Sequence, residues 1–458
     1  MISAVTAALA VYAAALLGLA WRTRTRVELD YLLAGRRLTL APFVATLVAT
    51  WYGGVLGVGE YSFRFGISNW LALGVPYYLA ALLFAFWLAA RARASAALSI
   101  PDQLRAAYGP TAARLGAGLV LVLALPAAYL LMLGELLDHY FGVPLAAALV
   151  AATLFTILYI AAGGFRSVVS TNVLQFALMY LGFIVLLPAA LHRIGGFAQL
   201  WQALPAVHRT WDGGLGVQAV LVWYVIALQT LVEPTFYQRC YAAASPAVAR
   251  RGVLTSVAFW ILYDFLTTFT GLAARALLPA GANPVLAYPE LARLVLPPLA
   301  NALFAVALFA NVMSAAHSYL FLGAATIGHD IVPELARRVN QRTWTMVGLA
   351  ITGAGAVALA LTLRSVVQIW HDVGSVVTSA LLLPLVLSHA PARFRFRRRP
   401  AVAAIAVTAL TALTWLLARG ASGRYPLGLE PIFPALTVSA LFWLVGRDRA
   451  AAQTQANA

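Results

Sequence analysis

Thirteen apolar stretches run along this chain of 458 residues, and each is long enough to cross a lipid bilayer. About 20 apolar residues in a helix are enough to span the hydrocarbon core. Hydrophobic residues make up 62% of the sequence and charged residues only 10%, which is too little polar surface for a water-soluble fold of this length. We therefore predict an all-α polytopic membrane protein with thirteen transmembrane helices, at 2–20, 40–59, 69–90, 113–138, 143–162, 168–191, 217–237, 252–277, 299–327, 343–363, 367–389, 401–418 and 429–446.

The arginines fix an expected orientation for these helices. All 31 basic residues are arginine, and an outside N-terminus places 23 of them in cytoplasmic loops and 8 on the outer side. Because cytoplasmic loops retain Lys and Arg, we predict a multi-pass protein of the cytoplasmic membrane with its N-terminus outside and its C-terminus inside. The net charge of +16 is then explained by orientation and by contact with anionic membrane lipids, and nucleic acid is not an expected partner.

Nothing in the sequence predicts a second domain or an enzyme. The longest loops, 192–216 and 278–298, are only about twenty residues long, so 1–458 is expected to form a single transmembrane domain. Cys240 is the only cysteine, which excludes a disulfide within the chain. No P-loop, cluster of His and Cys, or nucleophile-elbow serine is present. We expect no catalytic residue, no metal or cofactor, and no obligate protein partner.

Two of the predicted spans carry interruptions. The segment Tyr52–Gly59 holds four glycines in eight residues, and Glu233-Pro234 lies inside the span 217–237. Irregular backbone at membrane depth occurs where it lines a cavity or a site. Each interruption also has a simpler explanation, because glycines allow close helix packing and proline kinks a helix.

The positions of the interruptions favour a binding site. With the first span (2–20) set aside, the next ten form two sets of five, 40–191 and 217–389, followed by two peripheral helices in 401–446. Because five is odd, the two sets insert with opposite topology, and each interruption falls in the first helix of its set. Paired breaks at corresponding positions are the best sequence indication of a transporter site.

Several segments, in the expected order and spacing, resemble the sodium:solute symporter family. They are Asp30–Arg37, Ala49-Thr-Trp-Tyr-Gly-Gly54, Ile100–Leu104, Gly163–Ser167 with Thr171–Gln175, Gln238-Arg239, and Met313-Ser314. The family includes carriers of sugars, proline, pantothenate and sialic acid, and this chain looks like a divergent member. The resemblance implies a leucine-transporter-type fold of five plus five helices in an inverted repeat. It also implies sodium-coupled symport of a small organic solute by alternating access.

The resemblance also implies a sodium site. Backbone carbonyls at Ala49 and Tyr52, the hydroxyl of Ser314 and the side chain of Asn172 match the family's positions for the coupling ion. Two departures are expected to weaken sodium binding: Ala315 lacks the usual second hydroxyl, and Asn172 replaces an acidic residue. An unreplaced hydroxyl is worth on the order of 1–3 kcal/mol at a desolvated site.

Residues at both breaks are the expected solute ligands: Trp51, Gly53, Gly54, Leu56, Gln229 and Glu233. Trp51 suits a quaternary amine through cation–π attraction. An ionisable residue within a span is a functional hypothesis by default, so Glu233 either binds a cationic or hydroxylated solute or carries a proton. The simpler explanation is that Glu233 pairs with Arg239 or lies near water. Alternatives to sodium symport are a proton-coupled carrier, a uniporter, or a membrane sensor on a transporter scaffold; the sequence does not identify the solute.

Overall fold

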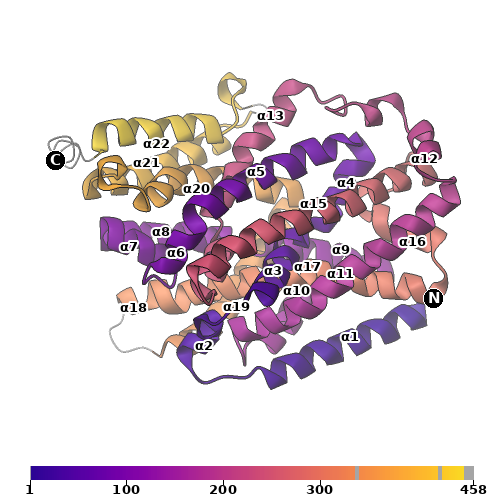
Figure 1. Cartoon of the computed structure of the whole chain (residues 1–458), viewed down its shortest axis with the longest axis horizontal. Coiled ribbons are helices and arrows are strands. Elements are labelled where there is room, and N and C mark those ends of the chain that lie inside the picture. The colour runs from indigo at the N-terminus through magenta and orange to yellow at the C-terminus, as the bar shows by residue number, and fades with distance from the viewer. Residues whose placement is uncertain (1, 336–339, 421–424, 448–458) are drawn as a thin grey trace.

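The computed structural model describes residues 2–335, 340–420 and 425–447, and in these ranges the ordered elements are helices, apart from two isolated β-bridges (Figure 1). Within these ranges, eleven helices, some of them kinked, are long and apolar enough to cross a membrane. The shorter apolar helices α10 (Leu145–Ile160) and α22 (Ile432–Gly446) occupy the two remaining predicted spans. The all-α membrane architecture is therefore confirmed, whereas thirteen full crossings remain a prediction.

The segment 40–191 contains five of the predicted spans, and its first three are interrupted. The first consists of α3 (Leu40–Trp51) and α4 (Val55–Phe65), and the second of α5 (Val75–Phe84) and α6 (Ala90–Ala94) with π-helical turns at Trp70–Gly74 and Ala85–Ala89. After the short α7 (Ile100–Tyr108), the third is divided into α8 (Pro110–Leu123) and α9 (Ala127–Phe141), and α10 and α11 (Phe165–Ile194) complete the set. The division between α8 and α9 precedes Ala127 because Pro126 cannot donate a helical hydrogen bond.

The segment 217–389 holds the next five spans. They are α13 (Val217–Ile226) with α14 (Pro234–Ala242), α15 (Pro246–Leu277), α17 (Pro298–Ala325), α19 (Gln341–Leu363) and α20 (Val366–Ser388). A π-helical turn at Thr326–Ile331 continues α17 into the short α18 (Val332–Leu335).

The remaining helices surround these two segments. α1 (Ile2–Arg22) packs against α17 and α11, while α21 (Arg398–Leu417) and α22 pack on each other and against α20, on the far side of the bundle (Figure 1). Connecting helices are α2 (Glu28–Leu33), α12 (Phe197–Ala203) and α16 (Ala287–Val295), with 3-10 turns at Ala34–Arg36, Ala206–Arg209, Pro284–Leu286, Ala392–Phe394 and Pro426–Gly428.

The centre of the bundle is formed by α3 and α17, which pack against each other and against α11 (Figure 1). α17 is buried along most of its length, yet it carries Asn311, Ser314 and Ser318. Spacings of three and four residues place these polar groups on one face of a helix. A polar face buried at the centre of an apolar bundle is where a site for an ion or a solute is expected.

Candidate functional site

The first discontinuity is a single 3-10 turn, Tyr52–Gly54, that joins α3 to α4. It is tighter than the glycine-rich segment Tyr52–Gly59 suggested, because α4 is already regular from Val55. Gly53 packs on α17 so closely that a Cβ built on it would lie 2.1 Å from the Cβ of Ala315. Gly54 packs beneath the Trp370 ring in the same way, because a Cβ built on Gly54 would lie 2.4 Å from the nearest carbon of that ring. Glycine at both positions therefore lets the turn contact α17 and α20 directly.

The second discontinuity lies between α13 and α14. A 3-10 turn covers Ala227–Val232, Glu233 is extended with φ −69° and ψ 112°, and α14 begins at Pro234. Proline is favoured at the first position of a helix, where its missing N–H is not needed. The Oε1 atom of Glu233 caps α14 by accepting hydrogen bonds from the backbone N–H and the hydroxyl of Thr235, at 3.3 and 3.1 Å.

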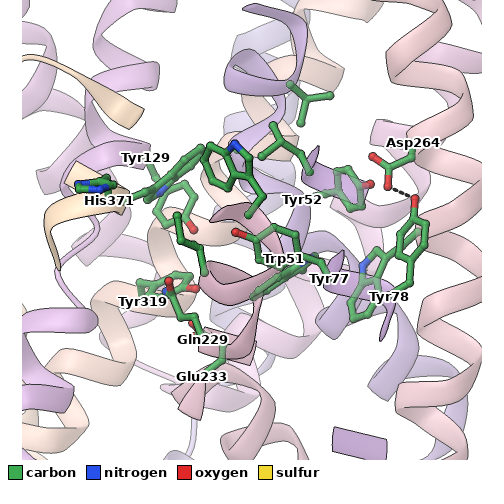
Figure 2. A pocket seen from close by; sticks show the side chains of 17 residues that line it. Trp51, Tyr52, Tyr77, Tyr78, Tyr129, Gln229, Glu233, Asp264, Tyr319 and His371 are labelled. Atoms are coloured by element: carbon green, nitrogen blue, oxygen red, sulfur yellow. Dashed lines mark hydrogen bonds between the residues drawn. The ribbon is translucent and has the colours of Figure 1, made fainter. Parts of the chain in front are cut away.

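Both discontinuities line one pocket of about 140 Å³ (Figure 2). Its walls come from α3, α4, α5, α9, α13, α15, α17 and α20. The lining residues are Trp51, Tyr52, Gly54, Val58, Leu73, Tyr77, Tyr78, Tyr129, Trp223, Ile226, Gln229, Glu233, Trp260, Asp264, Tyr319, Trp370 and His371. Such a concave, mainly apolar cavity with a few convergent polar groups is typical of a small-molecule site.

Aromatic rings form most of the pocket wall. The Trp51 ring packs against Phe236 and Tyr77, with centroids 5.1 and 5.6 Å apart, and against Trp260 at 6.0 Å. The Tyr129 ring contacts Tyr319 at 5.1 Å and Trp370 at 6.2 Å. Figure 2 shows Glu233 and Tyr319 on one side of Trp51, and Asp264 with Tyr78 on the other.

The two carboxylates of the pocket are bound differently. Asp264 Oδ2 accepts a hydrogen bond from the hydroxyl of Tyr78. Glu233 Oε2 has no hydrogen bond of ordinary geometry within the described part of the chain, although Tyr319 and Gln229 lie near the carboxylate. Glu233 therefore presents to the pocket one carboxylate oxygen that does not take part in capping α14, with Tyr319 and Gln229 near it.

The residues expected to bind sodium meet directly behind the first discontinuity. Ser314 Oγ lies 2.6 Å from the carbonyl oxygen of Ala49 and 2.5 Å from that of Asn311. A hydroxyl has one proton, so it donates to one of these carbonyls and keeps lone pairs for a cation. Tyr52, the other expected carbonyl ligand, is buried and lines the solute pocket with its ring.

Asn172 lies in a separate polar network about one turn further along α3 and α17. Its Nδ2 donates to the hydroxyls of Thr46 and Thr50 at 2.6 and 3.2 Å, and its Oδ1 is 2.8 Å from His317 Nε2. The amide oxygen is therefore already engaged, and it is not directed at Ala49 or Ser314.

Arg239 occupies the same network, which sequence reasoning missed. Its Nη2 donates to the hydroxyls of Thr50, Ser318 and Thr46 at 2.8, 3.0 and 3.2 Å, although its side chain is completely buried. Arg239 makes no ion pair with Glu233 in the structure. Its guanidinium instead donates hydrogen bonds to hydroxyls of α3 and α17. The repeat of hydroxyl residues along α3 and α17 was the sequence signal that could have located this network.

The structure thus separates the expected site residues. Trp51, Gly54, Gln229 and Glu233 line the solute pocket with Tyr52, and Ala49 and Ser314 form a pair behind it. Gly53 packs against α17, Leu56 is fully buried outside the pocket lining, and Asn172 belongs to the Arg239 network. Sequence reasoning did not single out Tyr129, Tyr319, Trp260 and Trp370, because aromatic residues in membrane helices are more often interfacial.

The fold and the paired discontinuities define a secondary active transporter of the membrane. The chain belongs to the sodium:solute symporter family, whose model matches residues 31–394. Among curated relatives, it is 24% identical to the sodium/pantothenate symporter of Escherichia coli (strain K12), over 91% of this chain and 89% of the relative. It is 26% identical to the osmoregulated proline transporter OpuE of Bacillus subtilis (strain 168), over 95% and 93%. The human high affinity choline transporter 1 is 25% identical, over 77% and 66%.

Solved structures with the same fold confirm the predicted fold class. A Na+-coupled sialic acid symporter in its substrate-bound outward-open state matches with a TM-score of 0.80 at 16% identity, covering 96% of this chain and 97% of the other. The nucleobase-cation-symport transporter Mhp1 matches with a TM-score of 0.56 at 12% identity, covering 90% and 93%. The protein is therefore a sodium-coupled symporter of a small organic solute with a leucine-transporter-type fold. It is not an enzyme, and family membership favours sodium over the alternatives.

Proposed function

We propose that the chain imports its solute into the cell, with sodium held between the Ala49 carbonyl and Ser314 and the solute in the aromatic pocket. The N-terminus is outside and the C-terminus is cytoplasmic in this proposal. The arginine distribution supports it, and so do the ends of the chain: α1 begins, and α22 ends, at opposite ends of the bundle (Figure 1).

The observation that carries the proposal is the convergence of two helix discontinuities on one pocket. Gly54 and Trp51 reach it from the first discontinuity, and Gln229 and Glu233 reach it from the second. Gly53 packs on Ala315, the neighbour of Ser314, so the sodium ligands and the pocket share one turn of backbone. A cation bound behind this turn holds α17 against the discontinuity and so shapes the pocket for solute.

The segments 40–191 and 217–389 are proposed as the two inverted repeats, with α1 and the segment 401–446 outside them. The support is the placement of the two discontinuities, since each lies in the first span of its segment. Alternating access would then move one group of helices against the other around the pocket.

The size of the pocket limits the solute. An engineered cavity of roughly 150 Å³ in another protein binds benzene, so about 140 Å³ suits a solute with few heavy atoms. Relatives named for proline and choline transport act on molecules of this size class.

Ser314→Ala is expected to weaken sodium binding by about 5-fold to 150-fold, because loss of a ligand hydroxyl costs roughly 1–3 kcal/mol. The measurement is the unfolding temperature of the purified protein as sodium chloride replaces potassium chloride at constant ionic strength. Ser379→Ala is the matched control, since Ser379 is also buried and donates to a carbonyl in its own helix, α20. Equal sodium dependence in the two variants would remove Ser314 from the site.

A further inference from the structure

We propose that the solute is a small organic cation, an ammonium compound whose charged nitrogen lies between Glu233 Oε2 and the aromatic rings around Trp51. This inference rests on the proposed function, since it takes the pocket as the solute site. It goes further by assigning the charge and the chemical class of the solute.

The charge of the pocket is the first argument. Glu233 and Asp264 are both buried and both line it, and no arginine is among its described lining residues. His371, at its edge, is held by two further acidic residues: Nδ1 lies 2.9 Å from Asp372 and Nε2 lies 2.8 Å from Glu430. Hydrogen bonds from both ring nitrogens to carboxylates require a doubly protonated His371, whose charge is compensated by Asp372 and Glu430. An anionic solute would face Glu233 and Asp264 with no uncompensated cation among the described lining residues, whereas a cationic solute would be attracted by them.

The buried cation Arg239 does not change this balance. The guanidinium of Arg239 is directed to the hydroxyls of α3 and α17, to the Gln238 side chain at 3.0 Å and to the Thr235 carbonyl. It does not line the pocket. An acidic solute in the pocket would therefore meet no arginine in the described structure.

The free oxygen of Glu233 is the second argument. Oε1 caps α14, a task that Ser, Thr, Asn or Asp performs equally well. Oε2 is buried with no hydrogen bond of ordinary geometry, and the polar side chains near the carboxylate are Tyr319 and Gln229. Buried polar atoms in proteins are almost always satisfied. Capping therefore accounts for one carboxylate oxygen and leaves the second for a ligand. An ammonium group would satisfy it, either through an N–H donor or through its charge.

The aromatic wall is the third argument. Trp51, Tyr77, Tyr129 and Tyr319 all line the pocket with Glu233, and their rings come from four different helices (Figure 2). Aromatic faces attract cations through the ring quadrupole, and the attraction is larger where water is excluded. Rings on several sides with a carboxylate beside them match the shape and the charge of a methylated ammonium group.

The test is equilibrium binding to the purified full-length protein in lipid nanodiscs, with and without sodium. The probes are a hydroxyethyl trimethylammonium cation and its uncharged isostere, in which a quaternary carbon replaces the nitrogen. The proteins are the wild type, Glu233→Gln and the matched control Glu135→Gln. Glu135 lies on α9 outside the pocket lining, and Glu233→Gln keeps an oxygen that can cap α14.

We expect the wild type and Glu135→Gln to bind the cation at least tenfold more tightly than the isostere, and Glu233→Gln to lose this preference. Equal affinity for the two probes, no binding of the cation, or an unchanged preference in Glu233→Gln would overturn the inference. The comparison with and without sodium separates the solute class from the proposed sodium coupling. If the protein binds the organic cation equally well in both conditions, the solute class is supported and the proposed coupling is contradicted.

Discussion

Gly53→Ala is expected to weaken sodium binding and to lower sodium-driven solute uptake by about tenfold to a hundredfold. The added Cβ would lie 2.1 Å from the Cβ of Ala315, far inside ordinary contact distance, so the turn Tyr52–Gly54 and α17 must separate. Overpacking of this kind costs roughly 1–3 kcal/mol. The separation also moves the Ala49 carbonyl away from Ser314 Oγ. The measurements are the rise in unfolding temperature with added sodium and the rate of sodium-driven uptake of an identified solute.

Gly118→Ala is the matched control for this substitution. Gly118 lies within α8, and nothing approaches an added Cβ there within 4 Å. Alanine is also the better helix former, so sodium dependence is expected to stay at the wild-type level. Wild-type sodium affinity in Gly53→Ala would show that close contact between the first discontinuity and α17 is not needed for the ion.

Arg239→Met is expected to lower the free energy of unfolding by about 2–4 kcal/mol and to abolish uptake. Methionine fills much of the space but removes the donors that bind Thr46, Thr50 and Ser318. Hydrogen bonds to charged groups contribute about 1.5–3 kcal/mol each, and the hydroxyls can re-pair in part through the Thr50–Ser318 contact of 2.8 Å. The unfolding temperature in detergent measures the loss.

Two further variants separate the hydrogen bonds of Arg239 from its charge. Arg239→Lys keeps the charge but cannot reproduce the planar fork of donors, so an intermediate loss of stability is expected. Arg250→Met removes a charge at an exposed position where the guanidinium lies over the Phe86 ring, and stability is expected to change little. If Arg239→Met were as stable as Arg250→Met, the Arg239 network would not hold α14 to α3 and α17.

Most of the fold could be predicted because membrane helices follow simple physical rules. Apolar length located α11 and α17 to within three residues at each end and α15 to within six, and the Glu233-Pro234 pair located the second discontinuity. The extent of the first discontinuity could not be predicted. Four glycines permit unwinding but do not require it, and only the contacts of Gly53 and Gly54 with α17 and α20 confine the turn to three residues.

The site was only partly predictable from the sequence. Residues at the two discontinuities could be identified because interrupted backbone is visible in the sequence. Tyr129 and Tyr319 could not, since they lie on regular helices and enter the pocket only through the packing of α9 on α17. The role of Arg239 was hidden for the same reason: its partners on α3 and α17 are distant in sequence.

The most direct test of the coupling site is a pair of high-resolution cryo-EM maps of the protein, one in sodium and one in potassium. We predict ion density within bonding distance of the Ala49 carbonyl oxygen and Ser314 Oγ in sodium, and none in potassium. The first discontinuity should then contact α17 more tightly in sodium. Ion density elsewhere, with Ser314 still donating to a carbonyl in both salts, would contradict the proposed sodium site.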